Sequence, residues 1–249
     1  VSSMSRSEDA NQLLNGKEVP FLEHDPALRE IMKNYIYGDV YQHGSLSIEL
    51  RDLILVVVMT ANHSLTSLKG HLEMALDRGL TPEKIKEAIY QCTPYVGLGK
   101  VEEALEVVHQ VFSARQMTVD SESLGTVNEQ TRYHDGLEVQ VQTFGEGMRE
   151  GYAKARDDLK HINRYLSEYC FGDFYTRQGL DGKTRELLTM VMILTLGGCE
   201  NQLRSHIQGN LALGNDRAVL VETITQCQPY IGFPRTLNAM NLVDEATLK

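Results

Sequence analysis

Two histidines, each with an acidic residue about twenty positions upstream, are the residues of this sequence best suited to chemistry. His206 follows Glu186, and His71 follows Asp52. A carboxylate beside an imidazole stabilises the protonated ring, and such a pair can deliver or remove a proton near neutral pH. The structural alternative is that each histidine only satisfies polar groups inside a helix. Because the pattern occurs twice, we interpret Glu186, His206 and His71 as candidate catalytic residues.

Both histidines belong to an internal repeat of about half the chain. The heptapeptide QCTPYVG at 91–97 returns as QCQPYIG at 226–232, 135 residues later, and the same shift pairs His71 with His206. Further upstream a shift of 134 residues pairs Arg51 with Arg185. A repeat of this length indicates two copies of one structural module.

The repeat and a change in composition predict the division of the chain. The polar stretch RQMTVDSESLGTVNEQT has a single turn-favouring glycine, which is typical of a linker. We therefore expect four parts: an N-terminal segment at 1–20, a first module at 21–114, a linker at 115–131 and a second module at 132–249. The N-terminal segment is the part we expect to be flexible.

The periodicity of apolar residues predicts an all-α fold. Residues 50–61 are apolar all round, as in a buried helix, although their valine run also fits a buried strand. Residues 64–79 have the spacing of an amphipathic helix that carries His71. Residues 81–92 begin with a threonine cap and a proline, and we expect the following PYVG to break this helix. No stretch predicts a β-strand with comparable strength.

Charge and cysteine content narrow the classes of function. The net charge is −10 and the pI is near 5.3, without a basic patch, which argues against nucleic-acid binding and favours small molecules or proteins as partners. Four cysteines without a CxxC pair suggest free thiols in a reducing, cytoplasmic compartment. The apolar run LLTMVMILTLGG is too short to span a membrane. The histidines lack the spacing of metal ligands, so we predict no metal site.

Several motifs of the second half, in order, resemble the carboxymuconolactone decarboxylase family. They are RYHDGLEVQVQTFGE at 132–146, YCFGDFYTRQGLDGKTRELLTM at 169–190, QLRSH at 202–206 and YIGFPRTLNA at 230–239. The first half resembles the family more loosely, through RDL, His71 and EAIYQCTPYVG. The resemblance implies two tandem helical modules of the alkylhydroperoxidase D type, and assembly of such modules into trimers or hexamers. For this chain we expect a homo-oligomer, with a trimer as the leading form.

The resemblance also implies decarboxylation of a small carboxylated lactone or related ring acid, a reaction that needs no metal or organic cofactor. It requires an anchor for the substrate carboxylate, a donor to the developing enolate oxygen and an acid that protonates carbon. Guanidinium groups match carboxylates, and tyrosine hydroxyls could line a pocket. The substrate-binding candidates are therefore Arg177, Arg185, Arg204, Tyr95 and Tyr230. Arg185 could instead pair with a neighbouring carboxylate, and each tyrosine could simply pack at a helix end.

We expect the main site in the second module, because the first has Asp52 in place of Glu186 and lacks FPR after its Tyr-x-Gly. The alternative enzymatic reading is a thiol-dependent hydroperoxide reductase. In that branch of the fold, cysteines stand seven and four residues before the histidine, and here those positions hold Cys199 and Gln202. The internal dithiol cycle is thus missing, although Cys199 could act with an external thiol. A third alternative is a small-molecule-binding or scaffold oligomer without catalysis. Cys92 and Cys227 are expected to be buried core residues.

Overall fold

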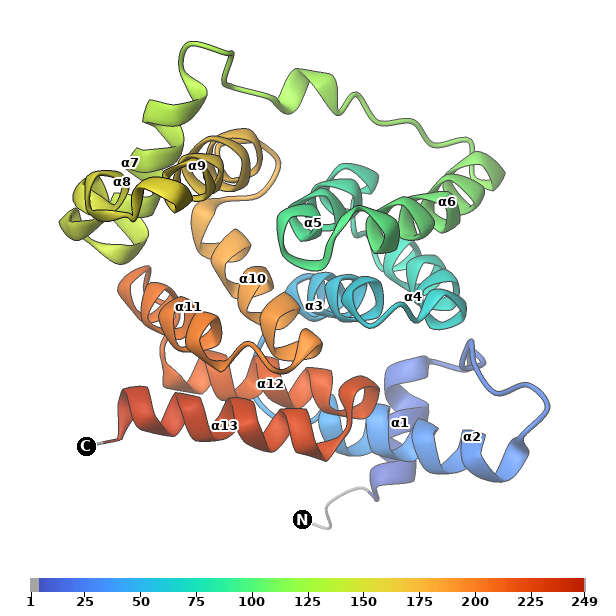
Figure 1. Cartoon of the computed structure of the whole chain (residues 1–249). Helices are drawn as coiled ribbons and strands as arrows, with labels where there is room; N and C mark the ends of the chain where they lie inside the picture. The colour runs from blue at the N-terminus through green and yellow to red at the C-terminus, as the bar shows by residue number, and fades with distance from the viewer. Residues whose placement is uncertain (1–4, 249) are drawn as a thin grey trace.

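The computed structural model describes residues 5–248, and within this range the chain is helical without a strand (Figure 1). The first half contains α1 (Arg6–Leu14), α2 (Pro26–Lys33), the π-helix η1 (Asn34–Val40), α3 (Ile48–Ala61), α4 (Leu65–Asp77), α5 (Pro82–Val96) and α6 (Leu98–Ala114). The second half contains η2 (Glu122–Leu124), α7 (Arg132–Phe144), η3 (Glu146–Glu150), α8 (Gly151–Lys154), η4 (Asp157–Leu159), α9 (Lys160–Tyr165), η5 (Leu166–Tyr175), α10 (Gly182–Leu196), α11 (Glu200–Ala212), α12 (Arg217–Ile231) and α13 (Phe233–Thr247). The expected all-α fold is confirmed.

The repeat is visible in the order of the helices. Helices α2 to α6 recur as α9 to α13, and each copy has a π-helix, η1 or η5, before its central helix. Helix α1 packs on η1 as α7 packs on η5. Both contacts depend on a glycine, since a Cβ on Gly38 would lie 2.2 Å from the carbonyl oxygen of Arg6 and one on Gly172 would lie 2.3 Å from that of Arg132. Helix α1, which belongs to the predicted N-terminal segment at 1–20, therefore packs on the first module, and residues 1–4 of that segment lie outside the described residues.

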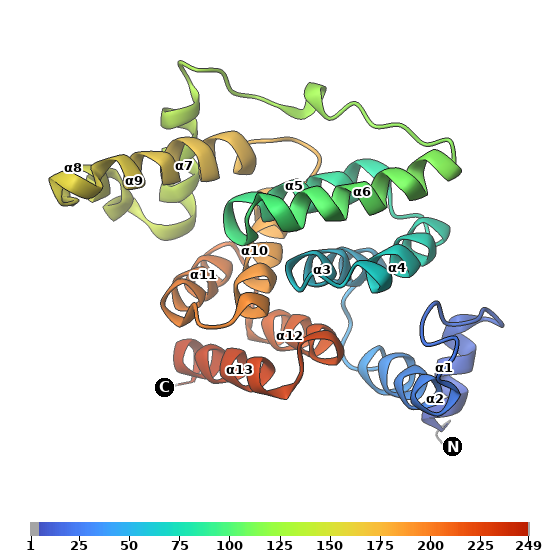
Figure 2. The same ribbon diagram turned by 45° about the vertical axis from the view of Figure 1, so that its right-hand side comes forward.

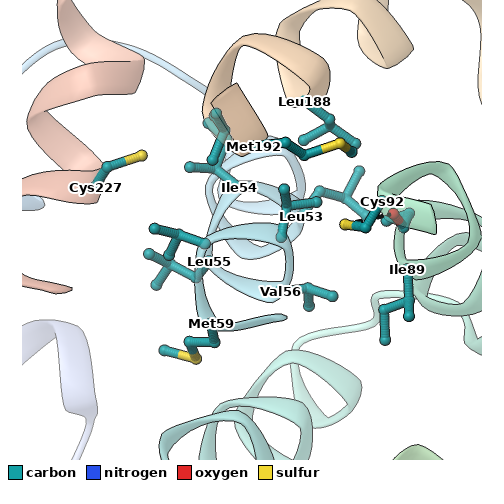
Figure 3. Packing of buried hydrophobic residues seen from close by; sticks show 14 of the residues in the cluster. Leu53, Ile54, Leu55, Val56, Met59, Ile89, Cys92, Leu188, Met192 and Cys227 are labelled. Atoms are coloured by element: carbon teal, nitrogen blue, oxygen red, sulfur yellow. Dashed lines mark hydrogen bonds between the residues drawn. The ribbon is translucent and has the colours of Figure 1, made fainter. Parts of the chain in front are cut away.

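The two modules share one hydrophobic core. Helices α3 and α10 pack against each other at the centre, and each also contacts the other module, α3 through α12 and α10 through α5 (Figures 1 and 2). Leu53 and Ile54 of α3 face Leu188 and Met192 of α10 in Figure 3, and all four are at most 2 % exposed. This burial on every side explains why the sequence of α3 is apolar all round.

The expected break at PYVG does not occur at the proline. Helix α5 continues through Pro94 to Val96 and ends at Gly97, whose φ of +91° suits glycine. Proline cannot donate to the carbonyl of Tyr90, and the Thr93 hydroxyl donates to this carbonyl instead, at 2.8 Å. Helix α12 likewise continues through Pro229 to Ile231. The two repeated tyrosines, Tyr95 and Tyr230, therefore lie on helices.

Between residues 5 and 248 no helix combines the length and the apolar character that crossing a membrane requires.

Candidate active site

The candidate acid/base pair meets inside the second module. Helices α10 and α11 pack side by side and bring Nδ1 of His206 to 2.6 Å from Oε1 of Glu186. The Glu186 side chain is 0 % exposed, and none of the described residues offers it a lysine or arginine within ion-pair distance. A buried carboxylate is costly unless a positive charge or donors compensate it. Among the described residues, His206 is the basic side chain within ion-pair distance of Glu186.

A chain of donors fixes Glu186 from its other side. The Tyr175 hydroxyl donates to Oε2 of Glu186 at 2.8 Å, the Tyr95 hydroxyl donates to Tyr175 at 3.4 Å, and the Cys170 thiol donates to Tyr95 at 3.3 Å. Burial, followed by the charge of Glu186, raises the pKa of Tyr175 well above its ordinary value, so this hydroxyl stays a donor. Because Glu186 accepts from Nδ1 of His206, the ring presents Nε2 to the neighbouring space.

That space is a cavity of about 940 Å³, which we call the second cavity. It lies between α7, α11 and the end of α5, and its lining includes Tyr95, Gln140, Phe144, Phe171, Cys199 and His206. The rings of Phe144 and Tyr95 stand edge-on to His206, with centroids 5.1 Å and 5.7 Å away. Its described lining contains no lysine or arginine. The site is thus a cavity with one imidazole at its wall, lined by apolar side chains and by the amides of Gln140, Gln142, Gln202 and Gln208.

The second cavity is built from both modules. Tyr95 belongs to the repeated heptapeptide of the first module, yet it contacts the histidine of the second. The exchange is reciprocal, because Tyr230 of the second module lines a cavity with His71 of the first. Both tyrosines are predicted from the sequence as substrate-binding candidates. The cavity that each one lines could not be predicted, because no local pattern shows which module the end of a helix will contact.

The arginines expected to anchor a substrate lie elsewhere. Arg185 is 0 % exposed, and its guanidinium donates to Glu87 at 3.0 Å and to Gln91 at 2.8 Å. Arg177 donates to the same Glu87 carboxylate at 2.7 Å. Arg204 lies on the surface and pairs with Glu245 at 2.6 Å. None of the three lines the second cavity. Arg185 instead pairs with a neighbouring carboxylate, which was the alternative interpretation of this residue.

Of the four cysteines, Cys199 lies on the second cavity. It is half-buried at the start of α11, and its thiol donates to the carbonyl of Gly197 at 3.5 Å. Cys92 and Cys227 are 0 % exposed, as expected, and burial raises the pKa of both thiols. Cys199 therefore shares the chamber of His206, with Gln202 at the position of a partner thiol.

The first module arranges the same residue types differently. Nε2 of His71 bonds the backbone carbonyl of Asp52 at 2.9 Å, while the nearest carboxylate oxygen of Asp52 is 3.9 Å away. Arg78 holds that carboxylate through two bonds, of 2.5 Å and 3.2 Å. Burial lowers the pKa of His71 below its ordinary value. His71 is therefore a neutral imidazole, and its carboxylate is neutralised by a cation.

Comparison with known proteins agrees with this architecture. The profile of the carboxymuconolactone decarboxylase family matches residues 26–110 and again residues 161–245. The chain is 31 % identical over 120 residues to a 4-carboxymuconolactone decarboxylase of Acinetobacter baylyi, which covers 48 % of this chain and 89 % of that protein. It is also 38 % identical over 78 residues to an uncharacterised 15.0 kDa protein of Paracoccus denitrificans, covering 31 % of this chain and 58 % of that protein. Since the profile matches both copies, the chain belongs to the carboxymuconolactone decarboxylase family.

Proposed function

We propose that this protein is a cofactor-independent decarboxylase that acts on a small carboxylated lactone, or a related ring acid, in the second cavity. The observation that carries the proposal is the buried pair of His206 and Glu186, whose Nε2 faces a largely apolar chamber. The similarity to a protein named 4-carboxymuconolactone decarboxylase supports this class of substrate.

The chemistry requires one bond to break and one proton to move. As the bond between the ring carbon and the carboxylate breaks, CO2 leaves and the electron pair enters the conjugated lactone carbonyl as an enolate. The imidazolium of His206 then protonates carbon through Nε2, and Glu186 stabilises the charge that the ring carries before the transfer. Tyr175 keeps Glu186 oriented toward Nδ1 of His206.

The absence of a cation from the described lining is compatible with this reaction. A guanidinium bound to the departing carboxylate would stabilise the ground state more than the transition state, because the charge leaves that group as CO2 forms. An apolar chamber instead disfavours the localised charge of the substrate carboxylate relative to the delocalised enolate. The lining by Phe144 and Phe171 fits such a role.

The decisive experiment compares His206→Ala with His71→Ala on a panel of carboxylated lactones, with released CO2 as the readout. We expect His206→Ala to lower kcat by roughly 10²- to 10⁴-fold with KM within a small factor, and His71→Ala to leave turnover close to wild type. Both variants are first checked for the wild-type oligomeric state. Wild-type turnover in His206→Ala would refute the acid/base role, and absence of CO2 release by the wild type across the panel would refute the decarboxylase itself.

A second candidate function rests on the position of Cys199 in the same cavity. Its thiolate could attack the terminal oxygen of an organic hydroperoxide, which would release the alcohol and leave a sulfenic acid that an external thiol reduces. Under the decarboxylase proposal, we expect Cys199→Ser to keep CO2 release within about threefold of wild type. Thiol-dependent consumption of cumene hydroperoxide by the wild type, lost in Cys199→Ser, would favour the reductase instead.

A further inference from the structure

His71 lines a cavity of about 310 Å³, formed by the first module together with Pro229 and Tyr230 of the second, which we call the first cavity. Its lining includes Phe21, Tyr37, Met59, Met74, His71 and Tyr230. Methionines and aromatic rings adapt to the shape of a flat apolar ligand and make favourable contacts with its faces and edges. The size and the lining suit a single small ring compound.

Two side chains of this cavity, one from each module, carry a polar atom without a hydrogen bond to residues 5–248, beside the hydroxyls of Thr66 and Ser67. One is Nδ1 of His71. Nε2 of this ring donates to the carbonyl of Asp52, and in a neutral ring the other nitrogen, Nδ1, is then an acceptor. The second is the hydroxyl of Tyr230, which burial keeps protonated and which is therefore a donor. Both residues line the first cavity, where a ligand can contact them.

The charged residues near His71 are already neutralised within the protein. The Asp52 carboxylate accepts two bonds from Arg78, and the Tyr41 hydroxyl donates to it at 3.4 Å. None of these charged groups lines the first cavity. Besides the hydroxyls of Tyr37, Thr66 and Ser67, the cavity therefore offers Nδ1 of His71 as an acceptor and the Tyr230 hydroxyl as a donor. It has no free charge in its lining to balance an anion.

The segment between α1 and α2 closes the first cavity. Pro20, Phe21 and Leu22 form part of its wall, and Leu22 takes a φ of +56°, in the left-handed region that leucine rarely adopts. Pro20 seats on Gly70 of α4, where an added Cβ would lie 2.8 Å from the proline ring. The equivalent position in the second module is Ser205, which lies on the rim of the larger second cavity. The first cavity is thus the smaller of the two, and residues 20–22 form one of its walls.

We propose that the first cavity is a second ligand site, which binds a small uncharged ring compound carrying a hydroxyl group and does not convert it. The ligand hydroxyl donates to Nδ1 of His71, and an oxygen of the ligand accepts from Tyr230. Catalysis is absent because the Asp52 carboxylate is bound to Arg78 and no imidazolium forms beside it.

The test uses fluorine NMR of the full chain with two probes of equal ring size, 4-fluorophenol, which is uncharged at pH 7, and 4-fluorobenzoate, which is an anion. The repeat supplies matched variants, since Ser67 lines the first cavity and Gln202 occupies the equivalent position of the second. We expect Ser67→Phe to weaken 4-fluorophenol binding at least tenfold with CO2 release unchanged. Gln202→Phe is expected to leave this binding event intact and to reduce the turnover proposed for the second cavity.

His71→Phe provides a second route, because it keeps a ring in the wall and removes the acceptor. We expect it, and Tyr230→Phe to a smaller degree, to weaken 4-fluorophenol binding with the helical circular dichroism spectrum unchanged. The proposal is overturned if 4-fluorophenol does not bind, or if Ser67→Phe and His71→Phe both bind it as the wild type does. Equal affinity of the first cavity for 4-fluorobenzoate would overturn the preference for an uncharged ligand. The binding measurements do not depend on whether the second cavity is a decarboxylase, whereas the comparison of CO2 release rests on the proposed function.

Discussion

Beside the buried carboxylate, the two modules differ at one further position of the repeat, Arg78 and Leu213. Arg78 and Leu213 are equivalent in the repeat and occupy the same place, the residue that ends α4 or α11, with nearly identical backbone angles. In the first module the arginine reaches the carboxylate of Asp52 at 2.5 Å. In the second module the leucine cannot do so, and Glu186 pairs with His206. The two modules thus differ in what holds the buried carboxylate, which is Arg78 in the first and His206 with Tyr175 in the second.

This difference predicts that Leu213→Arg inactivates the second cavity without touching its lining. The introduced guanidinium is expected to pair with Glu186, as Arg78 does with Asp52, and to remove the carboxylate from His206. We expect kcat for CO2 release to fall by roughly 10²-fold or more. Leu213→Gln is the control, because it is polar but has no charge, and it should stay within a few-fold of wild type. Full activity of a folded Leu213→Arg would contradict the role given to Glu186.

At the scale of elements, helices α5 and α12 connect the modules. Glu87 of α5 accepts from Arg185 and Arg177 of the second module, and Glu222 of α12 pairs with Arg51 of the first at 3.3 Å. The last turns of the same two helices carry Tyr95 and Tyr230 into the opposite cavities. In each helix, a buried ion pair with the other module holds the helix in place, and the tyrosine at the end of the same helix lines a cavity of that module.

We expect Glu87→Ala to destabilise the whole chain. It would leave Arg185 buried without its carboxylate, and removing one partner of a buried ion pair costs about 3–5 kcal/mol. The measurement is equilibrium unfolding in urea. Glu83→Ala, one turn earlier on the same face of α5 but exposed, is the control and should change the free energy of unfolding by less than about 0.5 kcal/mol. A loss below about 1 kcal/mol in Glu87→Ala would show that Arg177 and Arg185 find other partners.

At the scale of the molecule, both modules expose apolar residues at equivalent positions. Leu28 and Ile31 of α2 are 48 % and 58 % exposed, and their counterparts in α9, Ile162 and Tyr165, are 53 % and 50 % exposed. Two such surfaces, related by the repeat, provide a chain with two similar places to contact other copies of itself. They support the expectation of a homo-oligomer.

We therefore predict that light scattering detects an assembly larger than the 28.0 kDa chain, with a trimer as the expected form. The double variant Ile31→Lys and Ile162→Lys should shift the mass toward the single chain, because burying either lysine in an interface is unfavourable. Glu30→Lys is the control, because it introduces a lysine at an exposed position of α2 next to the apolar residues. A wild-type mass of one chain at micromolar concentration would exclude the assembly.

Much of the fold could be predicted from the sequence, because its determinants are local. The spacing of apolar residues predicts α3, α4 and α5, and the threonine and proline at Thr81 and Pro82 predict where α5 begins. The repeat predicts two modules because the same local signals occur twice. The pairing of Glu186 with His206 was also predictable, since successive helices in a small module tend to pack together.

The tertiary structure decided what depends on contacts between the modules. Tyr95 serves the cavity of the other copy, and Arg185 finds its carboxylate on α5, about one hundred residues away in the chain. The free energy of such contacts depends on which helix faces come together in the shared core, and a local pattern contains no information about that choice. Arg78 is a further case, because only its proximity to Asp52 distinguishes it from a surface arginine. The residue types were thus set by the sequence, whereas their partners were set by the packing of the two modules.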